Sequence, residues 1–94
     1  MIFQTKETKD LYEAVLSIES VEECGNFFED ICTVKELQDL SQRFQVAKLL
    51  KSGRSYQEIS KETGASTATI SRVNRSLCYG SGGYKSVLEK TEDK

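Results

Sequence analysis

The chain has 94 residues, enough for one domain with a small core, so residues 1–94 are predicted to form a single domain that oligomerisation would stabilise. It contains no histidine and neither a Gly-rich phosphate loop nor a nucleophile elbow, so nothing in it supports an enzyme, a cofactor or a metal site. The net charge is −2, and the absence of a long apolar run argues against a signal peptide or a membrane partner and predicts a cytoplasmic protein.

The first half of the chain predicts three amphipathic helices. Residues 8–19 carry apolar side chains at helical spacing. Ser20 with Glu23 predicts a capping box for a second helix, and Thr33 with Glu36 predicts one for a longer helix that ends at Gly53. The stripe of that longer helix is Val34, Leu37, Leu40, Phe44, Ala47 and Leu50. Short helices need a packed apolar face, so residues 8–53 either fold back within one monomer or pack against a partner's helices.

Residues 55–79 predict a helix-turn-helix. Ser55 and Glu58 form a capping box for its first helix, and Gly64 stands at the helix end, where a left-handed backbone is needed. Ser66 is positioned to cap a second helix. The buried stripe of that second helix is Ile70, Val73 and Leu77. Two short helices that cross at a glycine turn can seat a recognition helix in the major groove of DNA.

The opposite face of the second helix is chemically suited to double-stranded DNA. It carries Ala68, Ser71, Arg72, Arg75 and Tyr79. Small residues let the helix approach the base edges, the Thr67 and Ser71 hydroxyls can form hydrogen bonds there, and the two arginines can pair with phosphate or guanine. No acidic residue occurs from Thr63 to Tyr84. This composition favours DNA binding over an ordinary packing helix.

Charge and cysteine content are consistent with that interpretation. Residues 1–40 hold three Lys/Arg against ten acids, net −7, whereas residues 41–94 hold ten against five, net +5. The basic groups therefore gather in the half that carries the helix-turn-helix. The three cysteines, Cys24, Cys32 and Cys78, lack CxxC spacing and are predicted to be buried or half-buried apolar groups. Glycines near residue 80 precede a short last helix, residues 83–91.

The run RFQVAKLLKSGRSYQEISKETGASTATISRVNRSL resembles the tryptophan repressor family, and is most similar to the small Trp-repressor-like proteins of Gram-positive bacteria. The resemblance extends over residues 8–90. It implies an all-α, Trp-repressor-like helical bundle with a helix-turn-helix, an intertwined homodimer formed by residues 8–53, and a palindromic operator. The implied DNA-reading positions are Gln57, Ser60, Ser66, Thr67, Ala68 and Ser71. We expect the phosphate contacts to be Arg72, Arg75, Arg54 and Lys51.

The family's effector site uses a Thr, an Arg and a Ser, and Thr69, Arg72 and Ser76 match them. Val73 stands where the family's repressor has glycine, and Gln42 stands where it has a second arginine. The valine would crowd a flat ligand, so we expect L-tryptophan not to be the corepressor. The sequence therefore predicts a DNA-binding transcriptional repressor. Two alternatives are a regulator with another small-molecule effector and a protein–protein adaptor on the same fold.

Overall fold

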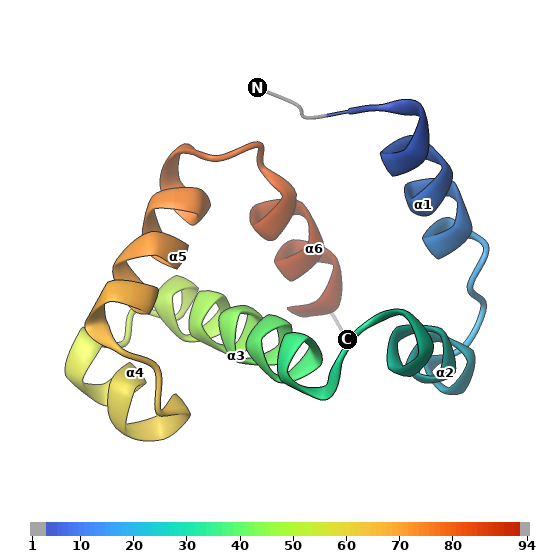
Figure 1. The fold of residues 1–94 in the computed structure, drawn as a ribbon. Helices are drawn as coiled ribbons and strands as arrows, with labels where there is room; N and C mark the ends of the chain where they lie inside the picture. The colour runs from blue at the N-terminus through green and yellow to red at the C-terminus, as the bar shows by residue number, and fades with distance from the viewer. Residues whose placement is uncertain (1–3, 93–94) are drawn as a thin grey trace. The chain divides into compact units, whose positions relative to one another are not determined.

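The computed structural model describes residues 4–92 of the chain, so both ends of the predicted 1–94 domain lie outside the described residues (Figure 1). The described residues form an all-α fold with six helices: α1 Lys6–Leu16, α2 Val21–Ile31, α3 Val34–Lys51, α4 Tyr56–Thr63, α5 Thr67–Tyr79 and α6 Gly83–Glu92. None of these helices combines the length and the apolar character needed to cross a membrane. The chain divides into two compact units, Met1–Leu37 and Gln38–Lys94.

In the first unit, α1 begins earlier and ends earlier than the predicted range 8–19. Its start is set by a capping box that the sequence analysis missed: the Thr8 backbone N–H donates to Thr5 Oγ1 at 3.1 Å, and the Thr5 N–H donates to Thr8 Oγ1 at 2.7 Å. Its end is set by Ser17, whose hydroxyl donates to the Ala14 carbonyl at 2.6 Å. Serine and threonine compete for backbone groups in this way, so they delimit the helix.

The two capping boxes predicted next have different outcomes. At Thr33 both bonds form, since Glu36 N–H donates to Thr33 Oγ1 at 3.1 Å and Thr33 N–H donates to Glu36 Oε1 at 2.8 Å. At Ser20 only half of the box forms. The Ser20 hydroxyl accepts from the Glu23 N–H at 3.0 Å, but the Glu23 carboxylate accepts from the N–H of Glu19 at 2.9 Å. The carboxylate reaches one residue further back than a capping box requires.

Neither α1 nor α2 contains a buried residue. Leu16 is 83% exposed and Val21 is 90% exposed. Phe27 and Phe28 contact each other edge to face, with ring centroids 5.7 Å apart. The predicted half-burial is correct for Cys24 and Cys32 but wrong for Cys78, which is exposed. Cys78 lies five residues after Val73, about 140° around α5 from that buried side chain.

The hydrophobic core lies in the second unit. It consists of Val46, Ala47, Ile59, Ala65, Ile70, Val73 and Leu88, drawn from α3, α4, α5, α6 and the turn between α4 and α5. The predicted stripe of α3 is correct at Ala47 but wrong at Val34 and Leu40, which are 75% and 42% exposed, and it omits Val46. The last helix runs to Glu92, one residue beyond the predicted range 83–91, and Leu88 anchors it in the core. This core positions α4 and α5.

Candidate nucleic-acid interface

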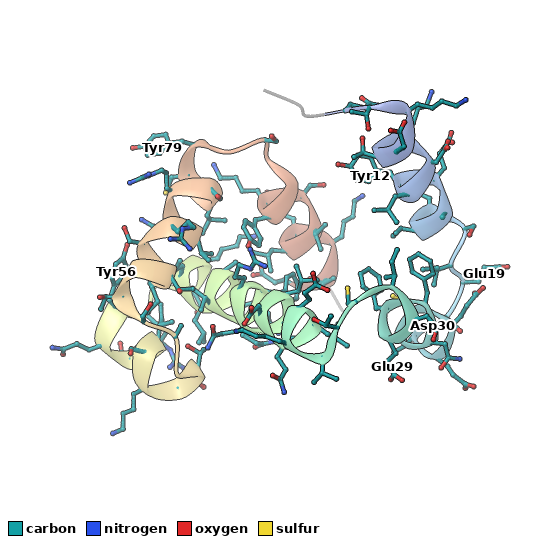
Figure 2. The ribbon with its side chains drawn as sticks, in the orientation of Figure 1. Tyr12, Glu19, Glu29, Asp30, Tyr56 and Tyr79 are labelled. Carbon is teal, nitrogen blue, oxygen red and sulfur yellow. The ribbon has the colours of Figure 1, made fainter. Side chains whose placement is uncertain are left out.

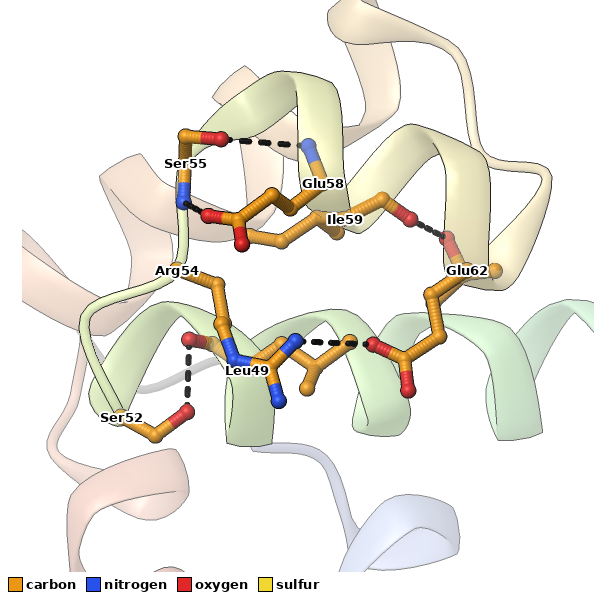
Figure 3. Close-up of polar contacts among 8 residues, drawn as sticks. Leu49, Ser52, Arg54, Ser55, Glu58, Ile59 and Glu62 are labelled. Atoms are coloured by element: carbon orange, nitrogen blue, oxygen red, sulfur yellow. Dashed lines mark hydrogen bonds and ion pairs between the residues drawn. The ribbon is translucent and has the colours of Figure 1, made fainter.

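The first helix of the predicted helix-turn-helix begins at the expected capping box (Figure 3). Glu58 N–H donates to Ser55 Oγ at 3.1 Å, and Ser55 N–H donates to Glu58 Oε1 at 3.0 Å. The hydrogen bond from the Ser55 backbone is the main cause of a lowered pKa at Glu58, helped by the Ser55 side chain and the charge of Arg54. The carboxylate therefore stays ionised to lower pH than usual, and the stabilisation from its bond to the Ser55 N–H decreases as the pH falls through that lowered pKa, while the bond from the Glu58 N–H to Ser55 Oγ remains.

The turn between α4 and α5 is held mainly by hydroxyl groups. Gly64 has a φ of 77°, the left-handed conformation that its position predicts. Ser60 Oγ donates to the Ala65 carbonyl at 2.8 Å, while Thr63 Oγ1 donates to the Ile59 carbonyl at 2.7 Å and accepts from the Ala65 N–H at 3.1 Å. The half-buried Ser60, predicted as a DNA-reading residue, thus has its hydroxyl proton engaged in the turn.

Gln42 fastens this turn to α3. Its Nε2 donates to the Thr63 carbonyl at 3.2 Å, across 21 residues of sequence. The acceptor is in the last turn of α4, where backbone carbonyls lack partners within the helix. The bond is not predictable from the sequence, because no local pattern connects the two residues. Gln42 therefore has a structural role at the position where the resembling family's repressor carries an arginine.

The second helix presents the face that the periodicity predicts. Ser66 caps α5, accepting from the Thr69 N–H at 3.1 Å. Ile70 and Val73 are buried, and Leu77 packs against the core. The exposed residues include Thr67, Ala68, Ser71, Arg72 and Arg75, together with Gln57 on α4. Tyr79 extends from the end of the helix and is 86% exposed, while Tyr56 opens α4 (Figure 2).

The four cations predicted to contact phosphate fall into two classes. Neither Arg72 nor Arg75 has an ion-pair partner among residues 4–92. In contrast, Lys51 Nζ lies 3.2 Å from Glu92 Oε2, and Arg54 Nη1 lies 3.4 Å from Glu62 Oε2. Both pairs are partly exposed, and such pairs are worth about 0–1 kcal/mol. The sequence offered no signal for the first pair, whose partners are 41 residues apart.

Three residues match the family's effector site, and one of them, Ser76, lines a depression on the second unit. Ser76 lines a depression of about 570 Å³ whose other walls include Phe44, Gly80, Tyr84 and Val87, but neither Thr69 nor Arg72 lines it. The Thr69 hydroxyl accepts a hydrogen bond from Ser66 Oγ at 3.1 Å. Val73 is only 2% exposed because its side chain belongs to the core. Among the described residues no group of His, Cys, Asp or Glu side chains is arranged to hold a metal ion.

Comparison with known proteins gives a consistent result. Residues 6–92 match the family model described as Trp repressor protein. The uncharacterised protein YerC of Bacillus subtilis is 48% identical over 88 residues, which are 94% of this chain and 85% of YerC. A TrpR-like protein from Eubacterium eligens is 52% identical with a TM-score of 0.91, over 95% of this chain and 92% of that one. A proposed Trp repressor from Staphylococcus aureus is 48% identical with a TM-score of 0.91, over 97% and 91%.

Proposed function

The chain belongs to the Trp repressor family of DNA-binding transcriptional regulators, and from that premise we propose that it is a repressor that binds a palindromic operator as a homodimer. The observation that carries this proposal is the exposed face of α5, where small polar residues accompany two arginines that have no ion-pair partner within residues 4–92. A recognition helix needs such a face, because its backbone must approach the base edges. A repressor acts on DNA, so the proposal also places the protein in the cytoplasm.

The proposed roles follow from exposure and chemistry. Gln57 on α4 and the exposed residues of α5 from Thr67 to Ser71 contact base edges, while Arg72 and Arg75 contact phosphates. Ser60 and Ser66 contribute by holding the turn and capping α5, since both hydroxyls are engaged there. An adaptor that binds only proteins would not need this basic, acid-free face.

Selection of bound duplexes from a random pool, at roughly 50 and 200 mM salt, tests sequence-specific binding. We expect the same inverted half-sites at both salt concentrations, with centres about 10 base pairs or a multiple apart, because two identical recognition helices read one face of the duplex. Salt-dependent binding without an enriched sequence would contradict sequence recognition. A failure to bind any duplex would instead favour the adaptor.

The homodimer is supported by the apolar residues that a single chain leaves exposed. They include Leu16, Val21 and Val34 in the first unit and Val87 in the second. Large apolar groups left exposed in a single chain are typical of surfaces that a partner covers. A second copy that packs its first unit on these residues would also give α1 and α2 the buried face that short helices require.

We expect sedimentation equilibrium at low micromolar concentration to give about twice the 10.6 kDa chain mass. Leu16→Glu, at a side chain that is 83% exposed in the single chain, should increase the monomer fraction, because a buried interface does not accept an unpaired charge. Asn26→Glu, at an exposed polar residue of α2, is the control and should leave the mass unchanged. A folded wild-type monomer would contradict the dimer.

A further inference from the structure

Arg54 lies in a small charged hollow beside α4. The hollow has a volume of about 490 Å³ and is lined by Arg54, Glu58, Lys61 and Glu62. Figure 3 shows the Arg54 guanidinium extending toward Glu62, with Nη1 3.4 Å from Oε2. The two side chains are 48% and 54% exposed, so this ion pair is formed in contact with water and can open.

The two carboxylates of the hollow, those of Glu58 and Glu62, bind different partners. Glu58 accepts the Ser55 backbone N–H and completes the capping box, so its position is set by the start of α4. Glu62 lies in the last turn of α4, and the bond to Arg54 is the interaction that its carboxylate makes. Lys61 is also exposed in this hollow, yet it forms no ion pair with Glu62 in the structure. Glu62 is therefore the counter-ion of Arg54.

We propose that Glu62 is a negative determinant of DNA affinity, which weakens binding to any duplex by holding Arg54 in an intramolecular ion pair. The inference rests on the proposed function. Arg54 directly precedes Ser55, the N-cap of α4, and the first helix of a helix-turn-helix crosses the DNA backbone. Arg54 must exchange the Glu62 carboxylate for a phosphate when the duplex arrives. The exchange gives up an existing contact, so the net gain from Arg54 is smaller than that from a free cation.

The size of the effect follows from the strength of exposed ion pairs. Such pairs shift an equilibrium by about 1.4- to fivefold each. Removing the charge of Glu62 should therefore tighten DNA binding by about 1.4- to fivefold per protomer, with the largest gain at low salt, where exposed charges are least screened. The gain should be the same for an operator and for unrelated duplexes, because phosphates carry no sequence information.

The test uses Glu62→Gln, which keeps the size and helix propensity of the side chain while removing its charge. Glu89→Gln is the matched control, since Glu89 is exposed on α6, changes the net charge equally, and has no ion pair in the described structure. Both substitutions are also made in an Arg54→Ala background. Affinity for one duplex of arbitrary sequence is measured at several salt concentrations for all variants, and urea unfolding checks that each is folded.

Glu62→Gln should bind more tightly than Glu89→Gln when Arg54 is present, and the two should bind equally when Arg54 is alanine. Equal affinities with Arg54 present would overturn the inference and leave the proposed function intact. A gain that persists in the Arg54→Ala background would also overturn it, because Glu62 would then act by simple repulsion of phosphate. A wild-type protein that binds no duplex would contradict the proposed function and this inference with it.

Discussion

Replacing Arg72 and Arg75 together by alanine should weaken binding to every duplex. The loss of affinity between roughly 50 and 200 mM salt should be about a hundredfold smaller than for the wild-type protein. Both side chains are exposed on α5 and have no ion-pair partner among the described residues. A dimer would lose four phosphate contacts, and four contacts correspond to a log–log slope of about −3.6. Fluorescence anisotropy across a salt series measures the slope directly.

The matched control for this double variant is Lys85→Ala with Lys90→Ala. Both lysines are exposed on α6, and their removal changes the net charge by the same amount. The control should keep most of the wild-type slope, since long-range charge contributes less than direct neutralisation of phosphate. If the two double variants lost affinity and slope equally, the arginines would act only through net charge, and the assignment of α5 as the recognition helix would be wrong.

Val73→Gly should destabilise the second unit by about 3 kcal/mol, because it removes three buried carbons and leaves a cavity in the core. Val73 is 2% exposed and lies in one cluster with Ile59, Ile70 and Leu88. Ser71→Gly, on the exposed side of the same helix, is the control and should cost about 0.5 kcal/mol, which is the difference in helix propensity alone. Urea unfolding compares the two. Equal losses would show that Val73 contributes nothing by packing.

The burial of Val73 is also a reason to expect that the wild-type protein does not bind tryptophan. The position that would need to be a glycine is part of the core, and Gln42 is bonded to the Thr63 carbonyl. Calorimetric titration with L-tryptophan should give no saturable heat. Saturable binding with a dissociation constant on the order of tens of micromolar would contradict this expectation and make Thr69, Arg72 and Ser76 a working site.

Most features that depend on neighbouring residues were predictable from the sequence, although the capping box between Thr5 and Thr8 was not predicted. The capping box at Ser55 and the left-handed glycine after α4 are set within a few residues, and both are present as predicted. The buried stripe of α5 follows from helical periodicity because one face of that helix meets the core. The predicted box at Ser20 was wrong in one of its two bonds, because the Glu23 carboxylate accepts from the N–H of Glu19 and not from that of Ser20. The two N–H groups are adjacent, and the sequence pattern does not indicate which of them the carboxylate binds.

Features that depend on distant residues were not predictable. The bond from Gln42 to Thr63 and the ion pair of Lys51 with Glu92 join positions that only the folded chain brings together. The burial of Val46 depends on which elements surround α3, and the hydrophobic stripe of one helix does not specify them. The predicted DNA contacts remain predictions. The exposure and the chemical type of these side chains support them, and the proposed binding experiments test them.

The hydroxyl-based turn between α4 and α5 has an electrostatic consequence for a protein that approaches a polyanion. Aspartate is a common helix N-cap, but a carboxylate at the start of α5 would neutralise the positive end of the helix dipole and repel the DNA phosphates. Here Ser60, Thr63 and Ser66 supply the stabilising bonds with neutral groups. The bonds of the turn itself therefore place no fixed negative charge at the N-terminus of α5, and the positive end of the helix dipole has the same sign as Arg72 and Arg75 on the exposed face of that helix.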